Sequence, residues 1–383
     1  MIIGLVGKPS SGKSSFFKAA TLIDVKISSV PFTTIKPNVG IGYLIIDCID
    51  KEFGIQCKPN HGYCKNGKRF VPVRLVDVAG LVPGAHEGRG LGNQFLDDLR
   101  QASVLIHIVD VSGLTDEEGK VTEGHDPNFD IDFLEKEIDL WFASVLKKAI
   151  EKLGRKATSH ADVVKILSEQ LSGLEVNKQN IEDALSKASI NDIEKFASEL
   201  RKISKPIIIA ANKIDLEQAK GNFEKVKTKY PNVIPTSADS EIALKKAAEK
   251  NLVEYLPGNN FTIQDQSKLS SAQLAILDKI KAVINDYGST GVQQCLNKAA
   301  FELLNYIAVY PVADHNKLTD KDGNVLPDVY LVPKGTTVKE LAFKIHTSIG
   351  EKFIAGIDAR TKKRFAAEYA LKNNDIVEIA HAK

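Results

Sequence analysis

The stretch MIIGLVGKPSSGKSS, residues 1–15, determines the fold class of this chain. IIGLVG at residues 2–7 has the apolar pattern of a short buried strand. GKPSSGKS at residues 7–14 then fits the motif G-x-x-x-x-G-K-[ST], and SFFKAATL after it has helical spacing. A strand, a glycine-rich turn and a helix in this order form the context that a phosphate-binding P-loop requires. The sequence therefore predicts a nucleotide site at its beginning.

The residue types of this loop explain how it holds phosphate. Gly7 and Gly12 let the backbone turn so that successive N–H groups point at phosphate oxygens, and the helix that follows presents its positive end to the same anion. Lys13 is expected to reach the β- and γ-phosphates, and the Ser14 hydroxyl to bind Mg²⁺. The loop residues predicted to bind nucleotide are Gly7, Lys8, Pro9, Ser10, Ser11, Gly12, Lys13, Ser14 and Ser15.

Two further segments are expected to sense the γ-phosphate. PFTT at residues 31–34 lies in a polar segment bounded by proline, where Thr34 can complete the Mg²⁺ shell and order the loop. Asp77 ends an apolar strand at residues 71–76, and Gly80 follows three positions later. The Asp77 carboxylate can hold a water on Mg²⁺, and the Gly80 N–H can approach the γ-phosphate.

The base-recognition residues come much later in the chain. A buried strand at residues 206–211 ends in Asn212-Lys213-x-Asp215, and VIPTSA at residues 233–238 ends another strand. The Asp215 carboxylate can accept hydrogen bonds from guanine N1–H and the 2-amino group, which adenine lacks. Ser237 and Ala238 can supply backbone contacts around guanine O6. With the strand at residues 104–111, the pattern predicts an α/β GTPase domain with a mostly parallel sheet and the ligand at the carboxyl ends of the strands.

Composition is compatible with this class. The chain has 383 residues, of which 43% are hydrophobic and 26% charged, and a formal net charge of +2. This length allows two or three domains, and the small net charge gives no whole-protein argument for nucleic acid. The N-terminus does not resemble a signal peptide and no apolar run is long enough to span a membrane, so we expect a cytoplasmic protein without a membrane partner.

GKPSSGKSS, VPFTTIKPNVG and DVAGLVPGAHEGRGLGNQFLDDLRQA resemble the YchF family of Obg-related proteins, also called Obg-like ATPases, over nearly the whole chain. The similarity is greatest to archaeal GTP-binding members. The resemblance implies a P-loop hydrolase with a helical insertion and a C-terminal TGS domain, associated with ribosomes and translation. Bacterial and eukaryotic members usually carry Asn-x-x-Glu and accept ATP. Here the motif ends in Asp215, so we predict a preference for GTP with residual ATP use.

Two positions depart from common patterns. Relatives often have asparagine in the P-loop where this chain has Ser10, and that asparagine can help to hold potassium. The shorter serine leaves potassium activation open. Leu81 follows Gly80, where many small GTPases have a glutamine that orients the attacking water. His86 is the first candidate to replace it, with the alternative of a partner-binding or exposed loop residue, and His125 is the second. His107 is expected in the core.

The predicted domain organisation is a G domain at residues 1–128 and 204–300, a helical insertion at 129–203 and a TGS domain at 301–383. Apolar residues at three- and four-residue steps between Ile131 and Ala149 indicate an amphipathic helix, followed by helical periods at 161–171, 178–188 and 192–203. These helices either form a protruding coiled-coil-like arm, which the resemblance favours, or cover the sheet. After residue 304, four short strands and one helix at 336–349 predict a β-grasp fold, with Thr336 or Thr337 as N-cap and Glu340 near N3.

Two local clusters leave alternatives open. Arg360, Lys362, Lys363 and Arg364 can meet RNA phosphate or form a solvated hairpin. Cys57, His61 and Cys64 can hold zinc, although their spacing is not a common zinc pattern, or belong to a loop with free thiols.

Three functions remain under consideration. The chain is a slow GTPase that acts as a switch on the ribosome or a translation factor, a nucleotide-dependent RNA-binding module, or an ATPase with a stress or redox role.

Overall fold

The computed structural model describes residues 1–21, 38–78, 98–153 and 159–382. These residues form two compact units. Unit 1 contains the described residues up to Gly42 and those from Arg74 to Ala299, and unit 2 contains Tyr43–Val73 and the residues from Ala300 on. Residues 43–73, which the sequence analysis placed in the G domain, thus cluster with the C-terminal part of the chain.

The larger sheet has seven strands within the described residues, in the order β2-β4-β1-β5-β6-β7, with β3 beside β4. β1 pairs in parallel with β4 and β5, and β6 pairs in parallel with β5 and β7. The mostly parallel sheet is therefore confirmed, and the carboxyl ends of its central strands lie at one edge. The strands are β1 (Ile2–Val6), β2 (Val39–Asp47), β3 (Tyr63–Lys65), β4 (Lys68–Asp77), β5 (Val104–Asp110), β6 (Ile207–Asn212) and β7 (Ile234–Pro235).

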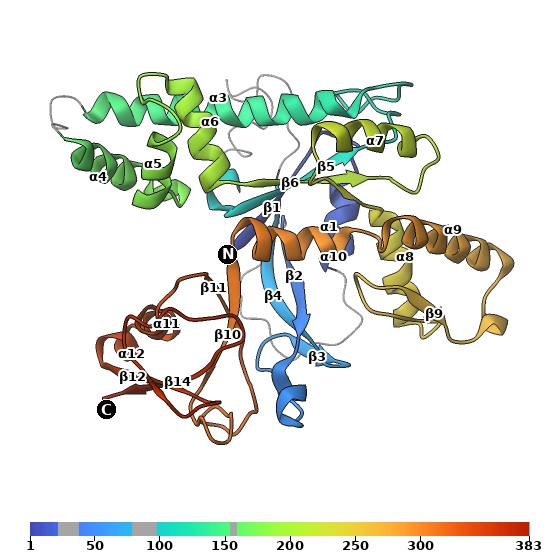
Figure 1. Cartoon of the computed structure of the whole chain (residues 1–383). Helices are drawn as coiled ribbons and strands as arrows, with labels where there is room; N and C mark the ends of the chain where they lie inside the picture. The colour runs from blue at the N-terminus through green and yellow to red at the C-terminus, as the bar shows by residue number, and fades with distance from the viewer. Residues whose placement is uncertain (22–37, 79–97, 154–158, 383) are drawn as a thin grey trace. The chain divides into compact units, whose positions relative to one another are not determined.

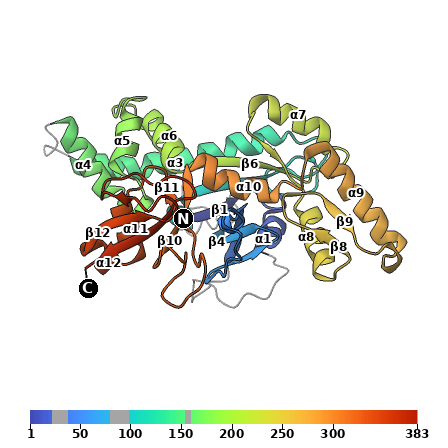
Figure 2. The same ribbon diagram turned by 60° about the horizontal axis from the view of Figure 1, so that its bottom comes forward.

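Helices cover both faces of this sheet in unit 1 (Figures 1 and 2). α1 and α10 lie on the side opposite to the long helix α3. A hairpin of two short strands, β8 and β9, comes before α9. The elements are α1 (Lys13–Thr21), α7 (Ala219–Lys229), α8 (Ala238–Glu249), β8 (Val253–Tyr255), β9 (Phe261–Ile263), α9 (Ser271–Tyr287), α10 (Val292–Lys298) and a π-helical turn at Ala299–Leu303.

The predicted helical insertion is present. Its α-helices are α3 (Pro127–Leu153), α4 (His160–Gln170), α5 (Lys178–Leu185) and α6 (Ile193–Ser204). Side chains of α3 and α6, such as Trp141 and Phe196, share one buried cluster with Val6, Val76 and Leu105 of the sheet. The insertion thus covers the sheet with part of its length, because its apolar faces continue the core of unit 1.

Capping determines where these helices begin. Ser159 and Asp162 form a reciprocal capping box at the start of α4, and Asn177 and Asn180 form one at the start of α5. Each pair satisfies two backbone N–H groups that a helix end would leave without a partner.

Unit 2 contains a five-stranded mixed sheet in the order β11-β10-β14-β12-β13. Two helices accompany it rather than the one that the sequence predicted. His346, in extended conformation, ends the first helix and accepts a hydrogen bond from Ser348 N at the start of the second. Thr337 is the N-cap and forms a capping box with Glu340. The elements are β10 (Tyr306–Val312), β11 (Tyr330–Pro333), α11 (Val338–Ile345), α12 (Thr347–Glu351), β12 (Phe353–Asp358), β13 (Arg364–Phe365) and β14 (Ile376–His381).

Residues 43–73 join unit 2 through apolar packing and hydrogen bonds. Cys48 and Ile49 share a buried cluster with Tyr310 and Ile376 of the C-terminal sheet. The Arg69 guanidinium, 1% exposed, donates hydrogen bonds to the carbonyl oxygens of residues 326 and 327. No helix among the described residues is long and apolar enough to cross a membrane.

Candidate nucleotide site

The P-loop connects β1 to α1 with the backbone conformation that an anion site needs. Ser10 and Gly12 have positive φ angles of 62° and 89°, which turn neighbouring N–H groups toward one side of the loop. A Cβ on Gly12 would lie 2.2 Å from the Asn212 amide nitrogen, and one on Gly7 would lie 2.6 Å from the carbonyl oxygen of Ile108. Glycine is therefore required at Gly7 by space and at Gly12 by both space and conformation.

Asn212, at the end of β6, joins the base-recognition side to the P-loop. Its Nδ2 donates to the carbonyl oxygen of Ser11 at 3.0 Å, and its Oδ1 accepts from the backbone N–H of Ala238 at 3.1 Å. The side chain is 2% exposed, so both hydrogen bonds are shielded from water. Asn212 therefore fixes the P-loop, β6 and the start of α8 relative to one another.

Asp215 and Ser237 form the part of the site expected to read the base. The Ser237 hydroxyl donates to Asp215 Oδ1 at 2.6 Å and also accepts from Ser240 N as the N-cap of α8. This contact orients the carboxylate at the wall of a cavity and leaves its other lone pairs for a ligand. The structure brings Asp215, Ser237 and Ala238 together with the P-loop, although more than 200 residues of sequence separate Asp215 from Ser14.

The Lys213 side chain contacts both the P-loop and the end of β5. Its Nζ donates to the carbonyl oxygen of Ser10 at 2.8 Å and to Asp110 Oδ2 at 2.7 Å. Burial would raise the pKa of Asp110, but hydrogen bonds from Lys213, Ser112 and Thr115 outweigh it and hold that pKa below its ordinary value. Asp110 therefore stays ionised and neutralises Lys213.

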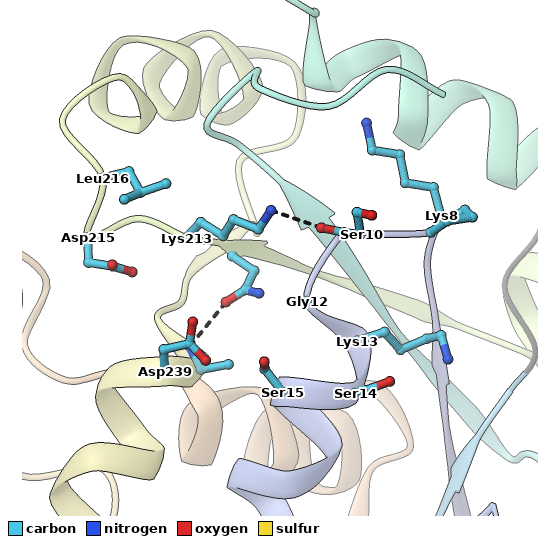
Figure 3. A pocket seen from close by; sticks show the side chains of 13 residues that line it. Lys8, Ser10, Gly12, Lys13, Ser14, Ser15, Lys213, Asp215, Leu216 and Asp239 are labelled. Atoms are coloured by element: carbon cyan, nitrogen blue, oxygen red, sulfur yellow. Dashed lines mark hydrogen bonds between the residues drawn. The ribbon is translucent and has the colours of Figure 1, made fainter. Parts of the chain in front are cut away.

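A cavity of about 560 Å³ lies between these elements (Figure 3). Leu216 and Asp239 also line the cavity, although no sequence motif predicted them. The only sequence feature that could have indicated these two residues is their position, because each directly follows a predicted site residue. The lining residues are Lys8, Pro9, Ser10, Gly12, Lys13, Ser14, Ser15, Asn212, Lys213, Asp215, Leu216, Ala238 and Asp239.

Of the residues predicted to hold Mg²⁺, Ser14 and Asp77 are among the described residues. Lys13 and Asp77 form an ion pair, with side chains 14% and 21% exposed. Ser14, the next residue in α1, lines the cavity. A hydroxyl and a carboxylate are hard oxygen ligands of the kind that Mg²⁺ takes, so Ser14 and Asp77 fit this ion by their chemistry. Thr34, Gly80, Leu81 and His86 lie outside the described residues.

The side chains of His125 and Lys8 both contact the buried carboxylate of Asp130. Asp130, at the start of α3, lies 2.8 Å from Lys8 Nζ and 2.8 Å from His125 Nε2. Burial raises the pKa of Asp130, against the influence of Lys8 and His125. The Lys8 side chain points toward α3, away from the other P-loop side chains (Figure 3), and also donates to the carbonyl oxygen of Thr115 at 2.7 Å.

His107 is a core residue, as expected. It is 1% exposed within β5, and burial, with a smaller effect of Lys8, lowers its pKa to about 3. A neutral, enclosed imidazole in mid-strand fits a structural role.

Comparison with known proteins places this geometry in context. Residues 210–314 match the Obg-like GTPase YGR210-like family, G4 motif-containing domain; residues 2–136 match the 50S ribosome-binding GTPase family; and residues 317–381 match the TGS domain. A GTP-binding protein of Methanocaldococcus jannaschii is 50% identical, covering 100% of this chain and 99% of its own.

A solved structure and a bacterial protein extend the comparison. The crystal structure of a GTP binding protein from Pyrococcus horikoshii OT3 is 39% identical with a TM-score of 0.79, covering 100% of both chains. The ribosome-binding ATPase YchF of Bacillus subtilis is 30% identical, covering 65% of this chain and 69% of its own.

Proposed function

This chain belongs to the YchF group of Obg-like P-loop nucleoside triphosphate hydrolases, and from that premise we propose that it is a slow, GTP-selective switch that associates with the ribosome. The observation that carries GTP selectivity is the placement of Asp215, hydrogen-bonded by Ser237, at the wall of the nucleotide cavity. A carboxylate there accepts from guanine N1–H and the 2-amino group, whereas adenine offers neither of these two donors.

Competition binding tests this selectivity. A fluorescent GTP analogue bound to the purified protein is displaced by unlabelled GTP, GDP, ATP or ADP in the presence of Mg²⁺. We expect guanine nucleotides to compete at least about 100-fold better than adenine nucleotides, because the paired hydrogen bonds form only with guanine. Equal competition by ATP and GTP would contradict the proposal.

Ser14, Thr34 and Asp77 are proposed to be the residues that would hold a Mg²⁺ ion. When bound with GTP, it would neutralise charge on the β- and γ-phosphate oxygens. Lys13 would leave its ion pair with Asp77 and meet a phosphate instead, since the Lys13 side chain already lines the cavity. Gly80 would then approach the γ-phosphate with its N–H.

Hydrolysis is proposed to be slow because Leu81 cannot hydrogen-bond to the attacking water. His86 remains the first candidate for a water-orienting group. His125 is the second, and its Nε2 is already engaged by the buried Asp130, which restrains the ring. Single-turnover rates of His86→Ala and His125→Ala decide between them. Unchanged rates in both variants would mean that neither residue orients the water.

The ribosome proposal is supported by the match to the 50S ribosome-binding GTPase family and by the similarity to the ribosome-binding ATPase YchF of Bacillus subtilis. A switch requires that GTP and GDP states bind the partner differently. Cosedimentation with ribosomes in GDP or in a non-hydrolysable GTP analogue measures this directly. Equal pelleting in both states would favour an RNA-binding module in which hydrolysis is incidental.

The basic cluster of unit 2 gives limited support to an RNA-binding function. It consists of Arg360, Lys362, Lys363 and Arg364. Arg360 is held by Glu52 at 2.6 Å and by the carbonyl oxygen of Asn374, and Lys362 donates to the carbonyl oxygen of His315. Two of the four cations are thus engaged within unit 2, which reduces the charge that the cluster can offer to phosphate.

A further inference from the structure

Unit 2 contains a group of metal-ligating side chains that the nucleotide site does not use. The Sγ atoms of Cys48, Cys57 and Cys64 and a carboxylate oxygen of Asp50 all lie within 4.8 Å of one another. Cys48, Asp50 and Cys57 are 5%, 3% and 5% exposed. His61, which the sequence analysis grouped with Cys57 and Cys64, instead pairs with Asp328 at 2.7 Å.

Local structure brings these residues together from three short segments. Cys48 precedes a 3-10 helix (η1, Ile49–Phe53), and Asp50 lies in its first turn. Cys57 follows in the loop, where its backbone N–H donates to Asp50 Oδ2 at 3.4 Å. Cys64 lies on β3, opposite Arg69 of β4. The hairpin β3–β4 thus places Cys64, the fourth candidate ligand, beside the other three.

The distances fit a tetrahedral zinc ion. Metal–sulfur bonds of about 2.3 Å separate two tetrahedral sulfur ligands by about 3.8 Å. The Sγ atoms of Cys48 and Cys57 are 3.6 Å apart, and Cys64 Sγ lies 3.7 Å from Asp50 Oδ2. All three cysteines are free thiols. Four side chains converge at ligand spacing, in contacts that are hydrogen bonds in the absence of metal, and no disulfide joins the three cysteines.

Two buried polar atoms independently indicate that the cluster is incomplete. Asp50 Oδ1 is buried and has no hydrogen-bond partner among the described residues, and the same holds for the Tyr310 hydroxyl. Tyr310 lies in the same apolar cluster as Cys48 and Cys57. An unpaired buried carboxylate oxygen costs several kcal/mol unless an ion or donor satisfies it. A cation bound by the Asp50 carboxylate would offset the cost of burying this charged group.

We propose that Cys48, Asp50, Cys57 and Cys64 bind one Zn²⁺ ion as a closed structural site. Each thiol loses its proton to solvent when it binds, and no oxidant or reductant takes part. Three thiolates, one carboxylate and Zn²⁺ leave a net charge of −2, the same as in a site of four thiolates. The buried Arg69 guanidinium on the adjacent strand offsets part of it. With four protein ligands, no position remains open for a substrate, which assigns the ion to structure rather than catalysis.

The ion would hold residues 43–73 in the conformation that docks onto the C-terminal sheet. The loop between Cys57 and Cys64 carries Lys58 and Asn60, whose backbone N–H groups donate to the carbonyl oxygens of Val325 and Pro327 at 2.8 and 2.9 Å. Because such a site does not exist in the unfolded chain, metal affinity becomes folding free energy of unit 2.

Metal analysis of the full-length protein tests the site. Protein purified from zinc-supplemented cells under reducing conditions, without an affinity tag that binds metal, is analysed by mass spectrometry for zinc and iron. We expect about one zinc per chain. Cys57→Ser and Cys64→Ser should lose most of it, and Cys295→Ala should retain it, because Cys295 is a buried thiol of unit 1 outside the cluster.

Cobalt binding is measured on the wild-type chain, so this second test does not depend on whether the cysteine variants fold. After the metal is removed with a chelator, Co²⁺ is added anaerobically and absorption is recorded. We expect thiolate charge-transfer bands and the intense visible bands of a tetrahedral site, displaced by Zn²⁺. Their absence, a Cys48–Cys57 disulfide in the purified protein, or iron in place of zinc would each overturn the proposal. GTP binding is measured in the same samples, and its failure would concern the nucleotide site alone.

Discussion

The nucleotide site of unit 1 and the cysteine cluster of unit 2 are suited to ligands of opposite charge and are built from different chemical groups. The first is suited to a polyanion and is built largely from backbone N–H groups of one contiguous loop, with positive φ at Ser10 and Gly12. The second is suited to a cation and is built from four side chains on segments whose positions depend on a hairpin and a 3-10 helix.

This difference explains why one site has a recognisable motif and the other does not. A backbone nest needs fixed spacing, because consecutive peptide groups form it. Side-chain ligands need only converge in space, so Cys48-x-Asp50-x₆-Cys57-x₆-Cys64 is a spacing that the fold permits rather than one that chemistry requires. The two sites should therefore respond independently to mutation.

The largest expected effect is at the base. In Asp215→Asn, the amide can no longer accept from both guanine donors, and we expect GTP affinity to fall about 100-fold or more. Xanthine carries a carbonyl in place of the 2-amino group, so the amide N–H should recover binding to xanthosine triphosphate. Titration with both nucleotides measures the change. An unaltered ratio of GTP to ATP affinity would rule out base reading by Asp215, and zinc content should stay constant.

Gly12→Ala tests the backbone of the P-loop. Alanine at a φ of 89°, with its Cβ 2.2 Å from Asn212 Nδ2, must shift the loop or the asparagine. We expect GTP affinity to fall about 30-fold, corresponding to roughly 2 kcal/mol. Isothermal titration measures it. The matched control is Gly221→Ala in α7, where nothing lies near the added methyl and stability should rise by up to about 1 kcal/mol.

Arg69→Met addresses the docking of residues 43–73 within unit 2. The variant removes two hydrogen bonds from a buried guanidinium to the carbonyl oxygens of Leu326 and Pro327. We expect the free energy of unfolding of unit 2 to fall by about 3 kcal/mol. Amide hydrogen exchange in β4 and β11 reports it. Lys68→Met, at a half-buried neighbour on β4 that pairs with the exposed Asp47, should have little effect. Reduced GTP affinity in Arg69→Met would contradict the independence of the two sites.

The smallest effect is expected at Asp130, which joins Lys8 of the P-loop to His125. Asp130→Asn keeps the shape but removes the charge that faces Lys8 at 2.8 Å. We expect unit 1 to lose about 1–2 kcal/mol and GTP affinity to fall less than about tenfold. Thermal unfolding with and without GTP separates the two effects. A loss of turnover without a loss of affinity would instead indicate that His125 acts on the water.

Local sequence patterns predicted the elements that local physics determines. The P-loop, its flanking strand and helix, and the Thr337 capping box with Glu340 follow from residues within a few positions of one another. The single helix predicted over residues 336–349 ran through His346, where the structure instead ends α11 and the imidazole caps α12 (Thr347–Glu351). The strand β13, of two residues, is too short to leave a pattern.

Long-range contacts were not predictable in the same way. Asn212 was expected at the nucleotide site, but its hydrogen bond to Ser11, 201 residues away, depends on β6 lying beside β5. The pairing of Lys8 with Asp130 depends on how α3 approaches the P-loop. Grouping His61 with Cys57 and Cys64 followed sequence proximity, whereas the turn at Gly62 and the hairpin bring Cys48 and Asp50 to the thiols instead.

By itself, the sequence determined a P-loop GTPase architecture with a helical insertion and a C-terminal TGS domain, because contiguous motifs fix backbone conformation and donor geometry. Only the tertiary structure decided which distant side chains complete each site and that residues 43–73 belong with the C-terminal sheet. These outcomes depend on strand order and loop path, which set the distance between residues far apart in the chain and leave no periodic pattern in the sequence.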